Sequence, residues 1–254
     1  EEAFRKGYAF ESAARPNNEK ALAAYAKAAR LGSLPAVYRQ GVVNKNEGNF
    51  PRALDYFRTA AAKGHIAAAV EAGEAFEKGR GCPVDQKSAM NYYAMAARAG
   101  CGDAQARLAA GCETGTGIAY SPEKAFEWYR RAAANNTAAG CTGLGLCYLE
   151  GRGTARDEKL GAVWLSRAAD MNDARALLEL AACYRAGKGV PADHEKERSL
   201  LIKAADAGSG KACLILGNAY LAEGNTDAAV RHYTKGARLG VERCAQALKN
   251  LRHG

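Results

Sequence analysis

The sequence has little proline, few aromatic residues and no long apolar run. Its 254 residues include 6 prolines, and aromatic residues make up 8%. No stretch approaches the roughly 18 to 20 consecutive apolar residues that a membrane-spanning helix needs, so we expect no membrane span. The first residues, Glu1-Glu2-Ala3-Phe4-Arg5-Lys6, contain neither an initiator methionine nor the apolar core of a signal peptide. We leave open that a targeting segment is missing from this end.

Alanine dominates the composition. It accounts for 57 residues, and it has the highest helix propensity because it loses no side-chain entropy in a helix. A mainly helical protein is therefore expected. The apolar fraction of 48% and the charged fraction of 25% exclude collagen, low-complexity disorder and a disulfide-stabilised miniprotein. The net charge of +9 is spread along the chain, so it allows weak attraction to acidic partners and specifies none.

A pattern of small and large residues repeats along the whole sequence. A pair of small residues recurs every 32 or 36 residues, at Ala28-Ala29, Ala60-Ala61, Ala96-Ala97, Ala132-Ala133, Ala168-Ala169, Ala204-Ala205 and Gly236-Ala237. A large residue lies three positions before each pair, at Tyr25, Phe57, Tyr93, Tyr129, Leu165, Leu201 and Tyr233. A small residue lies seven positions before six of the seven pairs. These positions share one face of an α-helix, so each unit is predicted to contain a helix with a small–large–small stripe.

A second helix is expected after each small pair, and in it a leucine followed by a small residue recurs at Leu108, Leu144, Leu180 and Leu216. One such helix pair cannot bury its apolar face alone, whereas a stack of seven can. The sequence therefore predicts an all-α fold, a right-handed α/α superhelix (solenoid) of about seven helix pairs with a C-terminal capping helix. We expect a single domain over 1–254, with units near 4–16/17–32, 33–64, 65–100, 101–136, 137–172, 173–208 and 209–240, and a cap at 241–254.

The loops between the units carry glycine and capping residues at fixed places. The 36-residue units contain Gly79-Arg80-Gly81, Gly115-Thr116-Gly117, Gly151-Arg152-Gly153 and Gly187-Lys188-Gly189. The first glycine of each suits a left-handed helix C-cap, and the second allows another tight reversal. Asp85, Ser121, Asp157 and Asp193 then lie where the N-cap of the next helix belongs. Two shorter units replace this loop with Glu47-Gly48-Asn49 and Glu223-Gly224-Asn225.

These motifs resemble the Sel1-like repeat, a relative of the tetratricopeptide repeat. The best matches are Lys203-Ala204-Ala205-Asp206-Ala207-Gly208 and the series Ala176, Leu180, Tyr184, Gly187, Gly189, Val190 and Asp193. The resemblance covers about residues 4–251 and implies a non-enzymatic adaptor or scaffold that binds a partner protein. It also implies a disulfide ladder in the cysteine-rich bacterial branch of the family. Cys141 and Cys213 occupy one position of that ladder, but alanine stands at the other, so we expect no such ladder here.

Eight cysteines and four histidines make a metal or redox site worth testing. The cysteines are Cys82, Cys101, Cys112, Cys141, Cys147, Cys183, Cys213 and Cys244. No two of them are spaced as Cys-x-x-Cys, and the histidines form no zinc-binding pattern with them. We therefore predict buried free thiols, which favour a reducing, intracellular compartment with the cytoplasm preferred. We predict no metal, no cofactor and no catalytic residue.

Two alternative functions remain open. A basic residue precedes the small pair at Lys27, Arg131, Arg167, Lys203 and Lys235, and this basic column could bind the phosphates of RNA or DNA. Asp170 and Asp206 follow three residues after two of these and favour intrahelical pairing instead. Some relatives are described as binding or weakly hydrolysing β-lactams, but the chain has no Ser-x-x-Lys motif. The nearest serines lie in Ser88-Ala89-Met90-Asn91 and Ser166-Arg167-Ala168-Ala169.

The favoured function is binding of a partner peptide or protein segment in the concave groove of the solenoid. In superhelices of this kind the first helix of each pair lines the groove. Counting along those helices predicts an apolar strip with a polar rim, which is typical of protein-binding grooves. The expected groove residues are Tyr38, Val42, Leu146, Leu149, Arg175, Leu178, Arg185, Lys211, Leu214, Asn218 and Leu221. The alternative is that the leucines pack between helices. The partner is unknown, and we leave open that the chain is a subunit of a larger assembly.

Overall fold

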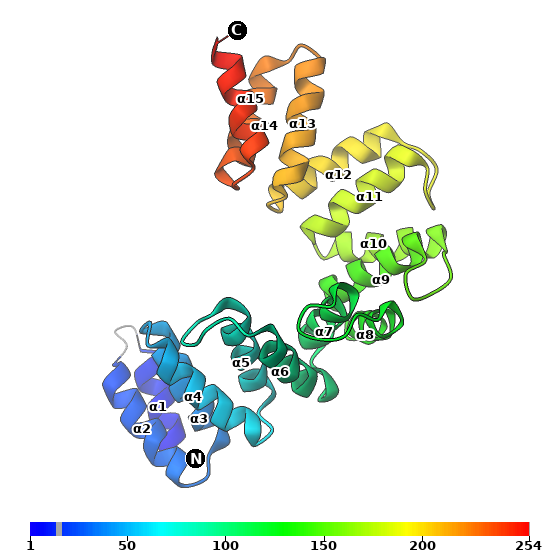
Figure 1. The fold of residues 1–254 in the computed structure, drawn as a ribbon. Coiled ribbons are helices and arrows are strands. Elements are labelled where there is room, and N and C mark those ends of the chain that lie inside the picture. The colour runs from blue at the N-terminus through cyan, green and yellow to red at the C-terminus, as the bar shows by residue number, and fades with distance from the viewer. Residues whose placement is uncertain (14–16, 254) are drawn as a thin grey trace. The chain divides into compact units, whose positions relative to one another are not determined.

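The protein is described by a computed structural model that covers residues 1–13 and 17–253, with the side chains of residues 252 and 253 excepted. The described residues form fifteen helices and no strand, arranged in two compact units, 1–121 and 122–254 (Figure 1). Unit 1 contains α1 (Glu2–Glu11), α2 (Asn18–Arg30), α3 (Leu34–Asn46), α4 (Phe50–Ala62), α5 (Ile66–Lys78), α6 (Gln86–Arg98) and α7 (Gly102–Thr114). Unit 2 contains α8 (Pro122–Ala134), α9 (Ala138–Glu150), α10 (Glu158–Asp170), α11 (Ala174–Ala186), α12 (His194–Asp206), α13 (Gly210–Ala222), α14 (Thr226–Arg238) and α15 (Glu242–His253).

Within each unit, every helix packs against the helices that precede and follow it in sequence. We call the odd-numbered helices α1–α13 the A helices and the even-numbered helices the B helices, and α15 is the final helix. The predicted all-α fold of repeated helix pairs with a C-terminal helix is confirmed. The single domain and its unit boundaries stay predictions, and residues 14–16 of the first predicted unit lie outside the described residues.

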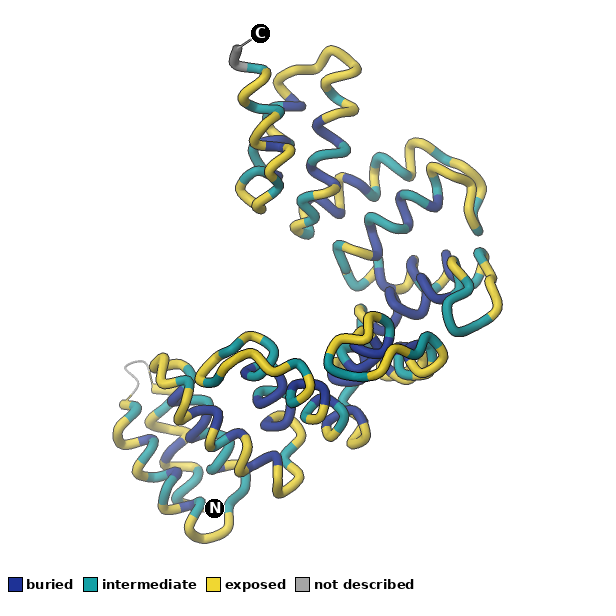
Figure 2. Tube along the Cα trace, viewed as in Figure 1, coloured by how far each residue is buried: buried dark blue, intermediate teal, exposed yellow. Residues whose placement is uncertain are grey.

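Figure 2 shows buried residues along the helices of both units, and the residues of the small–large–small stripe are mostly among them. Tyr25 and Tyr93 on B helices are fully buried, and Ala28, Ala96 and Ala97 of the recurring pairs beside them are almost completely buried. Gly73 on α5 shows why small residues face these rings. A Cβ atom at Gly73 would lie 2.6 Å from the Cε1 atom of Tyr93, so any larger residue would push the two helices apart.

Side-chain and glycine caps set the ends of the helices, as predicted. The carboxylates of Asp85, Asp157 and Asp193 accept hydrogen bonds from backbone N–H groups three residues later, at 2.9–3.0 Å. Helix α8 begins directly after Ser121. The first glycine of each long loop ends its A helix in the left-handed conformation, at Gly79, Gly115, Gly151 and Gly187.

The second glycine of each long loop has a further role that the sequence did not indicate. Gly189 has φ of +71°, and a Cβ atom there would overlap the carbonyl oxygen of Glu158, at the start of α10. Gly153 approaches the carbonyl of Pro122 in the same way, at the start of α8. Each loop therefore rests on the first turn of the preceding B helix, and only glycine leaves room for that contact.

Glu197 of α12 is the one residue that interrupts the column of small residues seven positions before the pair. The side chain of Glu197 is only 15% exposed, and it lies 3.0 Å from Nδ1 of His194, one turn earlier in α12. The carboxylate is thus accommodated at the start of the helix by a polar neighbour. None of the described helices combines the length and the apolar character that crossing a bilayer would require.

Candidate functional site

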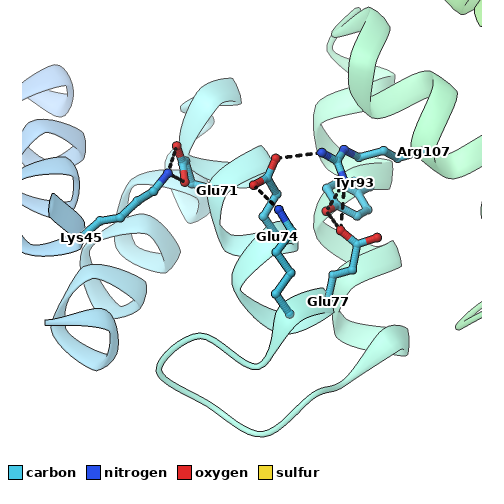
Figure 3. Close-up of polar contacts among 7 residues, drawn as sticks. Lys45, Glu71, Glu74, Glu77, Tyr93 and Arg107 are labelled. Carbon is cyan, nitrogen blue, oxygen red and sulfur yellow. Dashed lines mark hydrogen bonds and ion pairs between the residues drawn. The ribbon is translucent and has the colours of Figure 1, made fainter. Parts of the chain in front are cut away.

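In unit 1, ion pairs join successive A helices on one shared face (Figure 3). Lys45 of α3 lies 2.6 Å from a carboxylate oxygen of Glu71 on α5. Arg107 of α7 contacts both Glu74 and Glu77 of α5, each at 2.9 Å. All these side chains are between a fifth and about a third exposed, so their charges are only partly screened by water. The charged groups on this face mostly neutralise one another.

In two places on this face, a buried tyrosine of a B helix donates a hydrogen bond to a glutamate of an A helix. The Tyr93 hydroxyl donates to Glu77 at 2.8 Å, and the Tyr25 hydroxyl donates to Glu11 at 2.6 Å. Arg39 also donates to Glu11, at 3.1 Å. Burial, together with the bond to Glu11, raises the pKa of Tyr25 to about 12. Burial and the bond to Glu77 likewise raise the pKa of Tyr93, so both hydroxyls remain neutral donors at neutral pH.

These tyrosine–glutamate–arginine clusters were not predicted from the sequence, although a signal is present. Arg39 lies 14 residues after Tyr25, and Arg107 lies 14 residues after Tyr93. Desolvation alone would raise the pKa of Glu74, but its hydrogen bond with Lys78 and the charge of Arg107 outweigh it and lower that pKa. Glu74 thus stays charged and paired at neutral pH.

The predicted groove residues of unit 2 lie on the A helices α9, α11 and α13, with differing exposure. Those that are exposed are Arg175, Arg185, Lys211, Asn218 and Leu221, and those that are half-buried are Leu149, Leu178 and Leu214. Leu178 packs against the core cluster that joins α11, α12 and α13, and Leu214 packs against the cluster around Tyr233. The rim is therefore more accessible than the leucines, and Leu221, which is 38% exposed, is the most accessible of these apolar side chains.

Leu146 corrects the prediction of an exposed leucine strip. It is 5% exposed, and residues 140–147 of α9 are all buried. Gly143 and Gly145 explain this burial, because a Cβ atom at either position would collide with Tyr129 or Leu165 of the flanking B helices. The close approach of those helices covers Leu146, so it is not available to a partner.

The two groove residues predicted in unit 1 are both half-buried. The Tyr38 ring stacks on His65 with ring centroids 4.5 Å apart and meets Phe57 at 5.8 Å. Val42 follows Tyr38 by one turn on α3. Tyr38 is thus engaged within unit 1 in holding α3 against α4 and the start of α5.

The basic column of the B helices is largely engaged with its own neighbours. Arg131 lies over the ring of Trp128 at 4.7 Å, and Arg167 lies over Trp164 at 5.4 Å. Asp206 pairs at 2.7 Å with Lys235 of the following repeat, whereas the sequence suggested pairing within its own helix. Lys27 and Lys203 are exposed.

The thiols and serines form no reactive cluster that the structure describes. None of the eight cysteines is in a disulfide bond, and six are buried. Burial raises the pKa of Cys141, Cys183, Cys213 and Cys244, which disfavours the reactive thiolate. Ser88 is bonded to the capping carboxylate of Asp85. Within the described residues, no group of histidine, cysteine and acidic side chains is arranged to hold a metal ion. The reducing compartment stays a prediction.

Comparison with known proteins identifies the repeat. The family model "Sel1 repeat" matches seven times, at residues 6–33, 37–65, 66–101, 102–136, 138–173, 174–209 and 210–241. The chain belongs to the Sel1 repeat family. Each match corresponds to one A helix and the B helix that follows it. Sel1 repeat proteins are generally protein–protein interaction scaffolds, and the fold is typically non-enzymatic.

Two solved structures resemble this Sel1 repeat chain over most of its length. One is a protective antigen of uropathogenic Escherichia coli strains with an SLR fold, 26% identical, with a TM-score of 0.79 over 98% of this chain and 56% of the antigen. The other is a Sel1 repeat protein from Oxalobacter formigenes, 28% identical, with a TM-score of 0.74 over 84% of this chain and 89% of that one. The chain thus spans little more than half the length of the E. coli antigen. No curated protein matches the chain.

Proposed function

We propose that the chain is a non-enzymatic scaffold that binds an acidic, partly apolar segment of a partner protein on the A-helix face of unit 2. This face, formed by α11 and α13, consists of Arg175, Leu178, Arg185, Lys211, Leu214, Asn218 and Leu221. One observation supports the proposal. In the part of the chain that the structure describes, the cations of this face lack the close ion pairs that neutralise the cations on the A helices of unit 1. Within the described residues, Arg175 and Lys211 form no ion pair, and Arg185 approaches Glu197 only at 4.0 Å.

The charge balance of the two helices favours an acidic partner. Helix α13 has no acidic residue, and the single acidic residue of α11 is Glu179, which is half-buried. Carboxylates of a partner would meet Arg175 and Lys211 without displacing an existing ion pair. Complementary charge of this kind mainly speeds association and selects the partner.

The apolar part of the face supplies a smaller contact area. Leu221 is exposed, and Leu178 and Leu214 present the smaller part of their surface that the core does not cover. An apolar centre surrounded by polar and charged side chains is typical of protein interfaces. The Tyr233 hydroxyl, which donates to Asn218 at 2.8 Å, holds one side chain of this rim in place.

The alternative functions receive less support. A nucleic-acid ridge needs free cations in the basic column, whereas Arg131, Arg167 and Lys235 are already engaged with Trp128, Trp164 and Asp206. For β-lactam chemistry, the hydroxyl of Ser88 donates to the capping carboxylate of Asp85 and not to a lysine.

The test is capture of partners from native extract, followed by measured binding to the partner that is recovered. We expect Arg175→Glu/Lys211→Glu to weaken binding at least about tenfold, and to remove or reverse the weakening of binding by salt because the new carboxylates repel the acidic partner. Leu221→Asp should weaken it as well, without the loss of core packing that Leu178→Asp or Leu214→Asp would bring. Lys188→Glu, in the loop after α11, is the matched control. Equal binding by all variants with the fold intact would overturn the proposal.

A further inference from the structure

A column of rings on the B helices has one gap inside unit 2. Four residues before the small pair, most repeats carry an aromatic or imidazole ring: Tyr56, Tyr92, Trp128, Trp164 and His232. Tyr92 stacks on Phe76 of the A helix at 5.6 Å, and His232 stacks on Tyr220 at 5.3 Å. Leu200 occupies this position in α12, and Ala24 occupies it in α2.

A pocket is present where the ring is missing. Its volume is about 230 Å³, and Leu200 lines it together with Leu177, Leu180 and Tyr184 of α11. Ala24, the other exception, also lines a pocket, of about 210 Å³. Both positions without a ring therefore line a pocket.

The pocket at Leu200 has an apolar floor and a polar rim. Leu177 and Leu180 are 2% and 5% exposed, so the floor is continuous with the core. Tyr184 is the A-helix ring that would face the missing one, and the ammonium group of Lys196 lies 5.3 Å from its centroid. Ser166, Ser199, Lys203 and Asp170 complete the rim and add three donors and one carboxylate to it.

We propose that this pocket binds an aromatic side chain from an exposed segment of a partner polypeptide. A void of about 150 Å³ with apolar walls is enough to hold a benzene molecule, so the available volume suits a phenyl or indole ring. The ring would pack against Tyr184, as Phe76 and Tyr92 pack within their own repeat. The hydroxyls of Ser166 and Ser199 and the ammonium of Lys203 would donate to backbone carbonyls on either side of that ring.

This site is distinct from the A-helix face of unit 2. Leu177, Leu180 and Tyr184 recur along α11 at helical spacing, on the side of that helix turned toward α10 and α12. Arg175 and Leu178 lie on its opposite side. The pocket therefore goes beyond the proposed function and adds a second contact on the B-helix side.

The experiment uses single blocked amino acids as probes and the full chain as receptor. Saturation-transfer NMR is recorded with N-acetylphenylalaninamide, N-acetyltryptophanamide, N-acetylleucinamide and N-acetylalaninamide. We expect transfer to the two aromatic probes and at least about tenfold weaker binding of the leucine and alanine probes. Equal binding of the leucine probe, or no binding of any probe, would overturn the assignment.

Variants locate the binding on the chain. Leu200→Trp supplies the ring that Trp164 provides one repeat earlier, so it should fill the pocket and abolish binding. Leu200→Phe is measured in parallel, so that the test does not depend on the Leu200→Trp variant folding correctly. Ile202→Trp adds the same ring two residues away at an exposed position and should leave binding unchanged. Unchanged binding by the folded Leu200 variants would contradict the proposal.

Discussion

Units 1 and 2 are built from the same repeat, yet they treat charge on their A helices in opposite ways. In unit 1, Arg39, Lys45 and Arg107 are each bound to a glutamate of a neighbouring A helix. In unit 2, Arg175 and Lys211 have no such partner within the described residues. The repeat fixes the backbone and the core, whereas the exposed A-helix positions are free to vary. One scaffold can thus contain a self-neutralised region and a region whose charges remain available.

The largest expected effect tests what the two units share, the loop contact of the second glycine. Gly189→Ala should destabilise the protein by about 2–4 kcal/mol, because a Cβ atom would strain the positive φ and collide with Glu158. Gly117→Ala should cost a similar amount in unit 1. Gly208→Ala is the control, since it has φ of +93° and no atom within 4 Å, and it should cost about 1 kcal/mol. Urea denaturation measures all three, and equal costs for Gly189 and Gly208 would refute the contact.

The next effect tests whether the ion pairs on the A helices of unit 1 stabilise the protein. Arg107→Ala leaves Glu77 without its cation and leaves Glu74 paired with Lys78 alone. We expect a loss of about 1–2 kcal/mol because the cluster is only partly exposed. Lys211→Ala in unit 2 should change stability by less than about 0.5 kcal/mol. Hydrogen exchange of the α5 and α7 amides should rise in the first variant alone. Equal losses would mean that the ion pairs of unit 1 add no stability.

A smaller effect separates the buried hydroxyls of the two units. Tyr93→Phe removes a hydrogen bond to the carboxylate of Glu77, and Tyr233→Phe removes one to the neutral amide of Asn218. Bonds to charged groups are the stronger kind. We therefore expect a loss of about 1 kcal/mol for Tyr93→Phe and about half of that for Tyr233→Phe, measured by thermal unfolding. The reverse order would contradict the comparison.

The smallest effect depends on pH. Burial lowers the pKa of His65, and its Nδ1 atom accepts a hydrogen bond from Ala68 at the start of α5. The unfolded chain therefore binds a proton more readily, so stability should fall as the pH drops below about 6.5. The variant His65→Asn keeps a side-chain acceptor for the cap. We expect it to lose less stability than the original chain between pH 7 and pH 5, by a difference of under about 1 kcal/mol. The free energy of unfolding is measured by urea denaturation at each pH. If it falls with pH as steeply in the variant as in the original chain, His65 does not contribute to the pH dependence.

The fold could be predicted because its determinants are local and periodic. The capping aspartates, the loop glycines and the small pairs each act within one or two turns of their own position, so spacing alone located the helices. The partners on the A helices could not be predicted in this way. Glu11 and Arg39 are separated by 28 residues and meet only because two helices stack, and a single helix reveals nothing about that register.

The candidate site was predicted in part for the same reason. Counting along α11 and α13 placed Arg175, Lys211 and Leu221 at positions that are exposed. Counting along α9 failed for Leu146, because Gly143 and Gly145 draw the flanking helices close enough to cover it. Exposure depends on how near the neighbours come, which the period of a single helix does not encode.

The contact between each long glycine loop and the first turn of the preceding B helix has a consequence for how such chains change length. Deleting part of a unit would remove the helix turn that the following loop contacts. Deleting or duplicating a whole unit of 36 residues leaves each long loop in contact with the first turn of a B helix. Gene segments of that length can accordingly be gained or lost without redesigning the joints. Recombination in whole modules is then the natural route by which proteins of this type acquire a longer or shorter reach.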